Sequence, residues 1–325
     1  MNAGLKLLAD VGGTNARFAL QSGAGFDDIE VLACAEYPTL GAAMQAYLGK
    51  AAARGLPVDG VRHAAIAIAN PVEEDRVSMT NHHWSFSIEA LRQEQGLETL
   101  LVVNDFAALA MSLPHLAADG RERIGGGIEL PNRPIGLIGP GTGLGVSGVI
   151  PAGNRWIALA GEGGHVSFAP ANKEEVAILE ALWGEYGHVS AERLLSGMGL
   201  ELIHRALTGK RIDAPSITGA AIDGSSMDCI KTVQTFCAVL GSVAGNVALT
   251  LGATGGMYVG GGIVPRLGKL FTESAFRARF EDKGRLSPYL ARIPTYLITE
   301  QYPALRGVSA MLSDRVAQDH IAAMQ

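Results

Sequence analysis

The chain has 325 residues, of which 48% are apolar and 18% charged, and its formal net charge is −6. This length predicts two domains, or one large one, with a sizeable buried core. An acidic chain without a basic tract argues against nucleic acid as a partner. A phosphorylated ligand would therefore have to be held by backbone groups and a metal, not by a cationic surface.

The cysteines and the apolar runs indicate in which cellular compartment the protein is found. The chain has three cysteines, none in C-x-x-C spacing, which favours reduced thiols over a disulfide framework. Residues 1–8 lack the apolar core and cleavage site of a signal peptide, and the apolar run 236–251 is interrupted by two glycines and an asparagine. We expect a cytoplasmic protein without a membrane span. The eight histidines and three cysteines show no zinc-ligand spacing, so we expect no zinc.

The first part of the chain predicts a mixed sheet covered by helices. The continuous apolar run 63–69 is typical of a central strand that is buried on both faces. Thr39 and Ser87 are suitable N-caps for the two helices that follow them. In chain order, the pattern predicts strands at 5–9, 16–20 and 29–37, a helix at 39–54, strands at 63–69 and 76–80, a helix to 95, a strand at 100–103 and a helix at 106–113.

The second part predicts a similar order after a Gly- and Pro-rich stretch, 125–134, which we interpret as a domain connection. Asn172 and Glu175 form a variant of the capping box, and Val176, Leu179 and Trp183 supply the apolar stripe of the helix they begin. The other predicted elements are strands at 135–138, 146–150 and 156–159, helices at 190–195, 200–207 and 227–251, a strand at 255–259, a helix opened by Pro265, a strand at 296–298 and a helix at 307–317.

Both parts begin with a strand, a Gly/Thr-rich turn and a returning strand, which is a weak internal duplication. The turns are DVGGTN at residues 10–15 and GPGTGLGVS at residues 139–147. Two such halves that face each other would place both turns at one cleft, on either side of a nucleotide's phosphates. Either turn alone is equally consistent with a plain hairpin, whereas glycine also lets a phosphate approach the backbone N–H groups closely.

Two residues of these turns have specific consequences. Pro140 has no backbone N–H, so the donors of the second turn must come from Gly141, Thr142 or Gly143. Asp10 would repel phosphate unless Mg²⁺ lies between them, so we predict that it positions Mg²⁺, through water. The alternative for Asp10 is the common aspartate at the first position of a turn.

Four further stretches carry polar or glycine-rich candidates, and three of them have a structural alternative. Asn104 and Asp105 follow a buried strand, where Asp105 suits a general base but where helix caps are also common. A carboxylate and an imidazole flank two glycines at residues 162–165, which suits a polyhydroxyl ligand. Glu192 alone is explained by the helix dipole. Residues 260–262 form either a surface for a flat ring such as adenine or a tight strand–helix link.

These stretches together resemble the bacterial glucokinase family, within the actin-like ATP-binding superfamily. The matching stretches run in order over nearly the whole chain: residues 10–17, 79–82 with Trp84, 104–106, 141–146, 161–166, 168–170, 187–193, 195–197, 261–266 and 280–285. The resemblance implies an α/β fold with two actin-like (RNase H-like) domains, a small one at 1–115 plus 303–325 and a large one at 116–302, with a cleft between them.

The resemblance also implies a transferase of glycolysis that moves the γ-phosphoryl group of ATP to the 6-hydroxyl of glucose, with Asp105 as the base and Mg²⁺ as cofactor. It implies a homodimer. The sugar ligands would be Asn104, Asp105, Glu162, His165 and Glu192. The nucleotide would contact Ala9, Asp10, Val11, Gly12, Gly13, Thr14, Gly141, Thr142, Gly143, Gly261 and Gly262.

Three alternatives remain open at this point. The first is a kinase for another hexose, such as mannose or fructose, or one that uses polyphosphate. The second, a sugar-responsive transcription regulator, needs a DNA-binding domain, for which we expect no room before Asp10. The third is an actin-like or chaperone-like ATPase, against which the polar set of sugar ligands argues.

Overall fold

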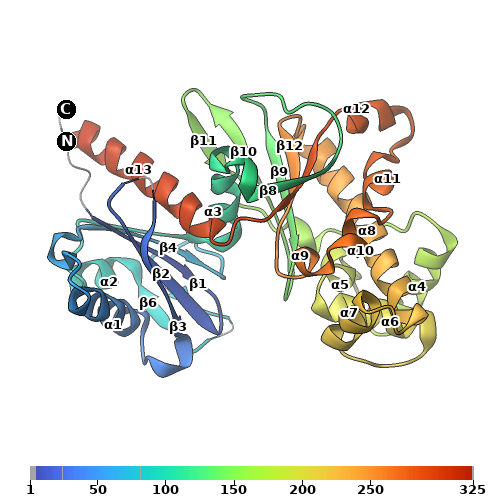
Figure 1. Ribbon diagram of the computed structural model, residues 1–325, viewed down its shortest axis with the longest axis horizontal. Coiled ribbons are helices and arrows are strands. Elements are labelled where there is room, and N and C mark those ends of the chain that lie inside the picture. The colour runs from blue at the N-terminus through green and yellow to red at the C-terminus, as the bar shows by residue number, and fades with distance from the viewer. Residues whose placement is uncertain (1–4, 24, 81, 324–325) are drawn as a thin grey trace. The chain divides into compact units, whose positions relative to one another are not determined.

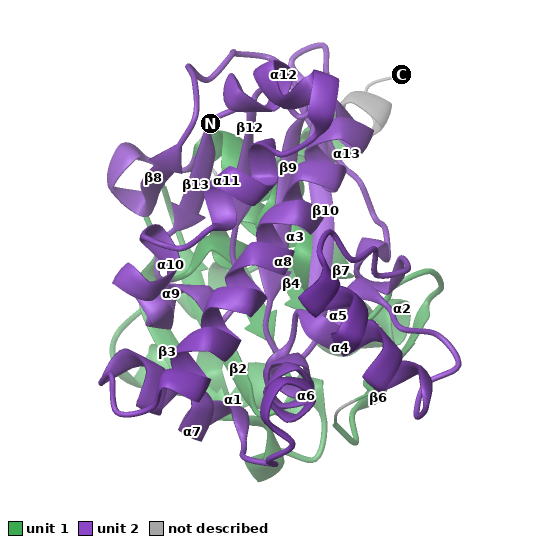
Figure 2. Ribbon diagram, turned by 90° about the vertical axis from the view of Figure 1, so that its right-hand side faces the viewer, with its two compact units in different colours: residues 1–115, 302–325 green, residues 116–301 purple. Residues whose placement is uncertain are grey.

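The computed structural model describes residues 5–23, 25–80 and 82–323. The chain divides into two compact units, coloured separately in Figure 2. Unit 1 comprises Met1–His115 with Tyr302–Gln325, and unit 2 comprises Leu116–Gln301. The predicted division differs from these units by one residue, since it assigned Tyr302 to the large domain.

Unit 1 is built on a five-stranded sheet with the order β3-β2-β1-β4-β7. Strands β1, β4 and β7 are parallel, whereas β2 and β3 run antiparallel to them. The carboxyl ends of the three parallel strands therefore share one edge of the sheet. The strand bounds are β1 Lys6–Val11, β2 Asn15–Gln21, β3 Asp27–Ala33, β4 His63–Ile68 and β7 Thr99–Asn104, and a separate pair is formed by β5 Arg76–Ser78 and β6 Ser85–Ser87.

Helices cover both faces of this sheet (Figure 1), because the side chains of each strand alternate between the two faces. On one face, Leu7, Ala9 and Val11 of β1 pack with α1, Leu40–Ala53, and α2, Ile88–Glu94. On the other face, Leu8 packs with α3, Asp105–Ser112, and α13, Pro303–Ala323. Thr39 and Ser87 accept N-cap hydrogen bonds as predicted.

The helices α3 and α13 come into backbone contact at Gly307. A Cβ atom there would overlap the carbonyl oxygen of Ala108 in α3. Small residues, including Ala65 and Ala67 of β4, also let both helices lie close to the sheet. The C-terminal helix therefore supports α3, whose first residue is Asp105.

Unit 2 contains a six-stranded sheet with the order β11-β10-β9-β12-β13-β8. The hairpin β9–β10 is antiparallel, and β12 is parallel to both β9 and β13. The bounds are β8 Arg121–Gly125, β9 Ile135–Pro140, β10 Leu144–Ala152, β11 Arg155–Ala158, β12 Gly256–Val259 and β13 Thr295–Ile298. With both sheets mixed and packed against helices, the predicted α/β class is confirmed.

One long helix, α8, Met227–Leu251, forms the centre of the unit 2 core. Its bounds agree with the predicted helix. Among the described residues it is the one helix that is long and apolar enough to cross a membrane. However, 67% of its apolar 18-residue stretch is buried inside the fold. The surrounding helices are α4 Lys173–Trp183, α5 Ala191–Leu194, α6 Gly197–Thr208, α7 Ala214–Ile222, α9 Val264–Leu267, α10 Lys269–Thr272, α11 Phe276–Glu281 and α12 Ser287–Ala291.

Three sequence-based interpretations of local structure are wrong in whole or in part. In the predicted apolar stripe of α4, Leu179 is buried as expected, but Val176 and Trp183 are exposed, and Ile178 and Leu182 are buried instead. The stretch 125–134 lies inside unit 2, where Gly125 pairs with Thr295, so it is no domain connection. The predicted strand 29–37 ends at Ala33 and continues as a 3-10 turn.

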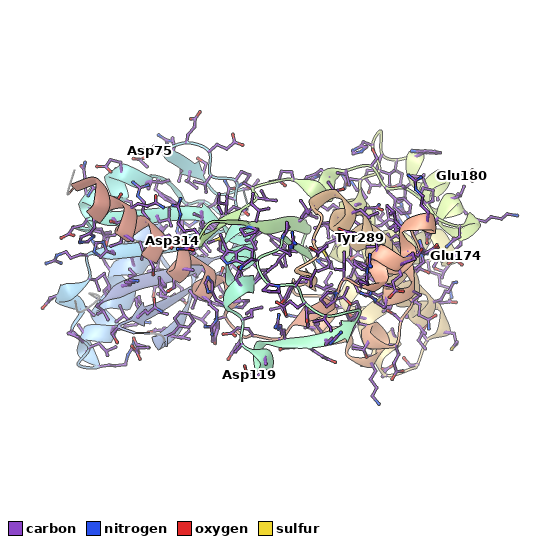
Figure 3. All side chains as sticks on the ribbon, turned by 90° about the horizontal axis from the view of Figure 1, so that it is seen from above. Asp75, Asp119, Glu174, Glu180, Tyr289 and Asp314 are labelled. Atoms are coloured by element: carbon purple, nitrogen blue, oxygen red, sulfur yellow. The ribbon has the colours of Figure 1, made fainter. Side chains whose placement is uncertain are left out.

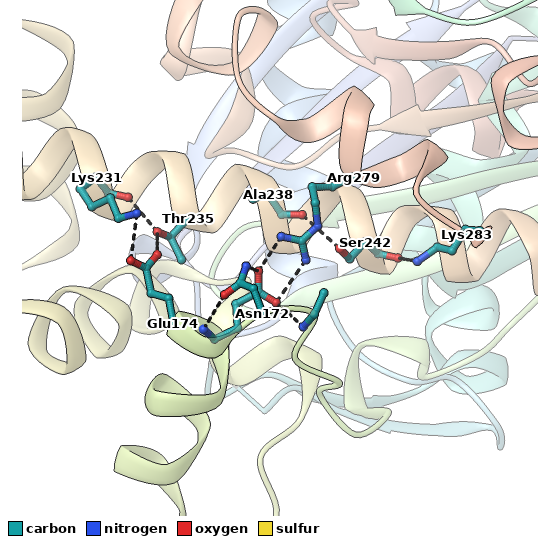
Figure 4. A network of polar contacts seen from close by, with 10 residues as sticks. Asn172, Glu174, Lys231, Thr235, Ala238, Ser242, Arg279 and Lys283 are labelled. Atoms are coloured by element: carbon teal, nitrogen blue, oxygen red, sulfur yellow. Dashed lines mark hydrogen bonds and ion pairs between the residues drawn. The ribbon is translucent and has the colours of Figure 1, made fainter. Parts of the chain in front are cut away.

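The N-terminus of α4 is tied to α11 by a buried ion pair, shown in Figure 4. Arg279 contacts both carboxylate oxygens of Glu175, at 2.6 and 3.1 Å. Glu175 also accepts hydrogen bonds from the backbone of Ala171 and the side chain of Asn172, and its own N–H donates to the Asn172 side chain as predicted. The Glu175 side chain is 2% exposed, so this carboxylate depends on these partners in place of water.

Replacing Glu175 should destabilise unit 2 strongly. Glu175→Ala leaves Arg279 without its partner, and the removal of one member of a buried pair costs about 3–5 kcal/mol. The adjacent Glu174 bonds Lys231 at 2.9 Å in an exposed pair, and Glu174→Ala should cost less than about 1 kcal/mol. Urea unfolding followed by circular dichroism measures both losses. Equal losses would contradict the importance of the buried pair.

Candidate active site

Polar side chains gather where the three parallel strands of unit 1 end. Asp10 is next to the last residue of β1, Asn104 is the last residue of β7, and Asn70 follows β4. The strand register pairs Asp10 with Ala67 of β4 and Asn104 with Ile68 of the same strand. These residues therefore share the edge of the sheet at which α/β folds bind ligands.

Asp10 is a largely buried carboxylate. Its Oδ2 accepts a hydrogen bond at 3.2 Å from Arg17, which lies opposite it on β2. Burial raises the pKa of Asp10 above its ordinary value, and the Arg17 guanidinium opposes part of this rise. A divalent cation bound nearby would favour the ionised form of this carboxylate.

The turn after β1 is closed by a hydrogen bond from the Gly12 N–H to the Asn15 carbonyl, at 2.9 Å. Thr14 is exposed at its tip. The side chains of Ala9 and Val11 are fully buried in the core against α1, so these two residues can offer a ligand only their backbone. At this turn, the predicted nucleotide contacts are therefore limited to backbone groups and the side chains of Thr14 and Asp10.

Asn104 is the N-cap of α3. Its Oδ1 accepts from the N–H groups of Phe106 and Ala107, at 2.9 and 3.1 Å. Asp105 begins the helix, and its Oδ1 accepts from the Phe106 N–H at 2.8 Å. The capping interpretation is therefore correct for Asn104, which also holds Asp105 at a fixed position in the first turn.

Asn70 is a polar residue of this edge that the sequence analysis missed. Its carbonyl oxygen accepts from Asn104 Nδ2 at 3.4 Å, and its Oδ1 accepts from the Thr80 N–H at 3.1 Å. The signal was present in the sequence, since Asn70 follows the apolar run 63–69 as Asn104 follows the strand before it. Asn81, part of the stretch 79–82 that carries the resemblance, lies outside the described residues.

In unit 2, the predicted second turn connects β9 to β10. The Gly141 N–H donates to the Gly143 carbonyl at 2.8 Å, so this N–H closes the turn. The Leu144 N–H donates to Glu192. The turn has three candidate N–H donors, Gly141, Thr142 and Gly143. Within the described residues, the N–H groups of Thr142 and Gly143 have no hydrogen-bond acceptor, so these two could donate to a ligand.

The glycine segment 260–262 lies directly beside this turn. The Gly260 N–H donates to the Ile138 carbonyl at 2.8 Å, and the Ile263 N–H donates to the Pro140 carbonyl at 3.3 Å. The structure therefore brings together the two predicted nucleotide-contacting stretches of unit 2, which are more than a hundred residues apart in the sequence.

Three predicted sugar ligands gather in unit 2. His165 lies 4.0 Å from Glu162 and 3.9 Å from Glu192, measured from its ring nitrogens to the carboxylate oxygens. His165 ends the 3-10 turn Gly163–His165, Glu162 directly precedes that turn, and Glu192 belongs to α5. Their side chains are 70%, 59% and 31% exposed, in the order Glu162, His165, Glu192, so all three can contact a ligand.

A sequence profile described as Glucokinase matches residues 7–315. The chain is 54% identical over 321 residues to a glucokinase of Chromobacterium violaceum, covering 96% of this chain and 90% of that protein. It is 55% identical over 322 residues to the bifunctional protein glk of Burkholderia pseudomallei, covering 97% of this chain and 49% of that protein. The chain thus spans about half the length of these bifunctional relatives.

Among solved structures, the fold is similar to a glucokinase from an Antarctic psychrotroph, with a TM-score of 0.87 and 34% identity. The match covers 95% of this chain and 99% of that chain. The α/β fold described above is therefore shared with that solved glucokinase structure. The chain belongs to the glucokinase family.

The raised pKa of Asp10 predicts how stability depends on pH. Between the ordinary carboxyl pKa, about 4, and the raised pKa of Asp10, the folded state binds the proton more tightly than the unfolded state. The free energy of unfolding therefore falls as pH rises through this window, and the loss persists above it. Asp10→Asn should make the protein more stable than wild type at pH 7, with the gain vanishing below pH 4.

Urea unfolding at a series of pH values measures this gain. Asp59→Asn, at an exposed aspartate of the same unit, is the control and should show no such trend. A gain from Asp10→Asn that stays constant down to the lowest pH would contradict the assignment to ionised Asp10.

Proposed function

We propose that this protein transfers the γ-phosphoryl group of ATP to the 6-hydroxyl group of glucose. The observation that carries the proposal is membership of the glucokinase family, with matching stretches over nearly the whole chain. The carboxylates and imidazole of unit 2 add support, because they can accept hydrogen bonds from several hydroxyl groups of one small ligand.

Asp105 is the general base in this proposal. Phosphoryl transfer depends mainly on alignment and charge stabilisation, and a positioned carboxylate helps by taking the proton of the attacking hydroxyl. Asn104 supports this role in two ways. Its Oδ1 caps the helix that begins with Asp105, and its Nδ2 faces the end of the neighbouring strand, at which a sugar hydroxyl could bind.

Glu162, His165 and Glu192 orient the sugar. Carboxylates accept hydrogen bonds from hydroxyl groups, and the imidazole can donate or accept according to its tautomer. Several such bonds fix the ring and leave one hydroxyl for reaction, which lowers the entropic cost of alignment.

The backbone of the turns at 12–14 and 141–143 holds the ATP phosphates, and Gly261 and Gly262 offer a flat surface to the adenine. Mg²⁺ fits Asp10, because this ion keeps several waters and binds through one or two carboxylates and the phosphates. When bound, it neutralises charge on the phosphates. The described residues contain no cluster of three His, Cys, Asp or Glu side chains that could hold a metal by themselves.

The proposal extends to the setting of the enzyme. The buried cysteines Cys34, Cys229 and Cys237 are consistent with the reducing cytoplasm, and the resemblance suggests a homodimer, which light scattering of the purified chain can measure. A kinase for another hexose is the second candidate. The same hydroxyl-binding groups serve mannose, so a panel of hexoses at fixed ATP decides between them.

Asp105→Asn should reduce kcat for glucose-dependent ADP release by about 10²–10⁴-fold. The affinity for glucose should stay near that of wild type, because the amide keeps the size of the carboxylate and an oxygen for the Phe106 N–H. A coupled assay measures kcat, and calorimetry measures glucose binding.

The matched control is Asp119→Asn. Asp119 is exposed, is labelled in Figure 3 and is not one of the candidate site residues. It should keep wild-type kcat. A full turnover rate in Asp105→Asn would overturn the assignment of the base, whereas a wild-type protein inactive on glucose but active on another hexose would overturn the assignment of the substrate.

A further inference from the structure

Glu192 contacts two parts of the candidate site in unit 2 at the same time. Its Oε2 accepts a hydrogen bond at 2.9 Å from the Leu144 N–H, at the end of the turn between β9 and β10. Its Oε1 lies 3.9 Å from His165 Nδ1, on the side of the predicted sugar ligands. One carboxylate therefore links the turn assigned to phosphate with the residues assigned to sugar.

The absence of a side chain at Gly143 makes this contact possible. A Cβ atom at Gly143 would lie only 2.5 Å from Glu192 Oε2. A larger residue would push the carboxylate away from the Leu144 N–H. Glycine at this position thus serves the approach of Glu192 in addition to any approach of a phosphate.

The segment that carries Glu192 holds the turn at a second point. The Gly197 N–H donates to the Gly141 carbonyl at 2.9 Å. Ser190 caps α5 just before Glu192 and Ser196 caps α6 just before Gly197, so the segment has a defined backbone conformation. Both sides of the turn are therefore bonded to residues 190–197.

We propose that Glu192 is a positioning residue for the nucleotide, in addition to being a sugar ligand. Its hydrogen bond holds the 141–144 turn in the conformation that presents the N–H groups of Thr142 and Gly143 to phosphate. A sugar hydroxyl that binds Oε1 restrains the same carboxylate, so sugar and nucleotide strengthen each other's binding by one shared factor. Both arms of this inference rest on the proposed function: the sugar arm on the assigned sugar ligands, and the nucleotide arm on the assignment of the 141–143 turn to phosphate.

Calorimetric titration of the full chain with MgADP, without sugar, tests the nucleotide arm. Glu192→Ala should weaken MgADP binding by about tenfold, the effect of losing a hydrogen bond to a charged group. Glu192→Gln should bind MgADP like wild type, because its amide oxygen accepts the same N–H. The matched control Glu162→Ala removes a carboxylate with no bond to the turn, so it should weaken glucose binding alone.

Repeating the titration with saturating glucose tests the coupling. Wild type and Glu162→Ala should bind MgADP more tightly once the sugar site is filled, and Glu192→Ala should lose this gain. Wild-type MgADP affinity in Glu192→Ala, or an equal loss in Glu192→Gln, would overturn the positioning role. Since the first titration contains no sugar, its result is independent of which sugar is phosphorylated.

A double-mutant cycle keeps the inference testable if Glu192→Ala alone changes stability, which thermal unfolding would reveal. Gly143→Ala should weaken MgADP binding in the wild-type background by displacing the carboxylate. In the Glu192→Ala background no carboxylate remains to be displaced, so the same change should cost much less. Additive effects of the two substitutions would contradict a direct contact.

Discussion

The hydrogen bonds at the tip of the β9–β10 hairpin are the interaction on which the unit 2 site depends. Within a few residues, the tip receives N–H groups from Gly197 and Ile263 and gives its own to Glu192. These partners come from α5, from the start of α6 and from Ile263, the residue directly before α9. The turn is thereby held by two segments that are distant in the sequence, residues 190–197 and the residues that follow β12.

In unit 1, the site residues are positioned by the packing of the sheet and not by hydrogen bonds to a turn. Its polar residues stand at the ends of parallel strands whose register is set by a sheet buried on both faces. A shift of one residue would exchange the side chains that pack on α1 and α2 with those that pack on α3 and α13, so the fit of both faces fixes the register that places Asp10 and Asn104. Local hydrogen bonds, such as the cap of α3, then orient individual side chains.

The sequence predicted well those features that depend on local chemistry. The caps at Thr39, Ser87 and Asn172, the two hairpins and the long helix α8 follow from side chains next to the affected backbone. The α4 stripe was predicted correctly only at Leu179, because the inward face of α4 is set by tertiary packing, which buries Glu175 against Arg279 and leaves Trp183 exposed. The contact between Glu192 and Leu144 joins residues far apart in the chain, and no local pattern contains it.

The return of α13 to unit 1 has a consequence for the order in which the chain can fold during synthesis. Unit 2 is continuous, whereas the sheet of unit 1 is covered on one face by residues after 301. Until these residues leave the ribosome, apolar side chains of that face, such as Leu8 and Leu101, have no helix α13 to cover them, and α3 lacks its neighbour at Gly307. Unit 2 can thus complete its core first, while the helix that begins with Asp105 gains its final support last.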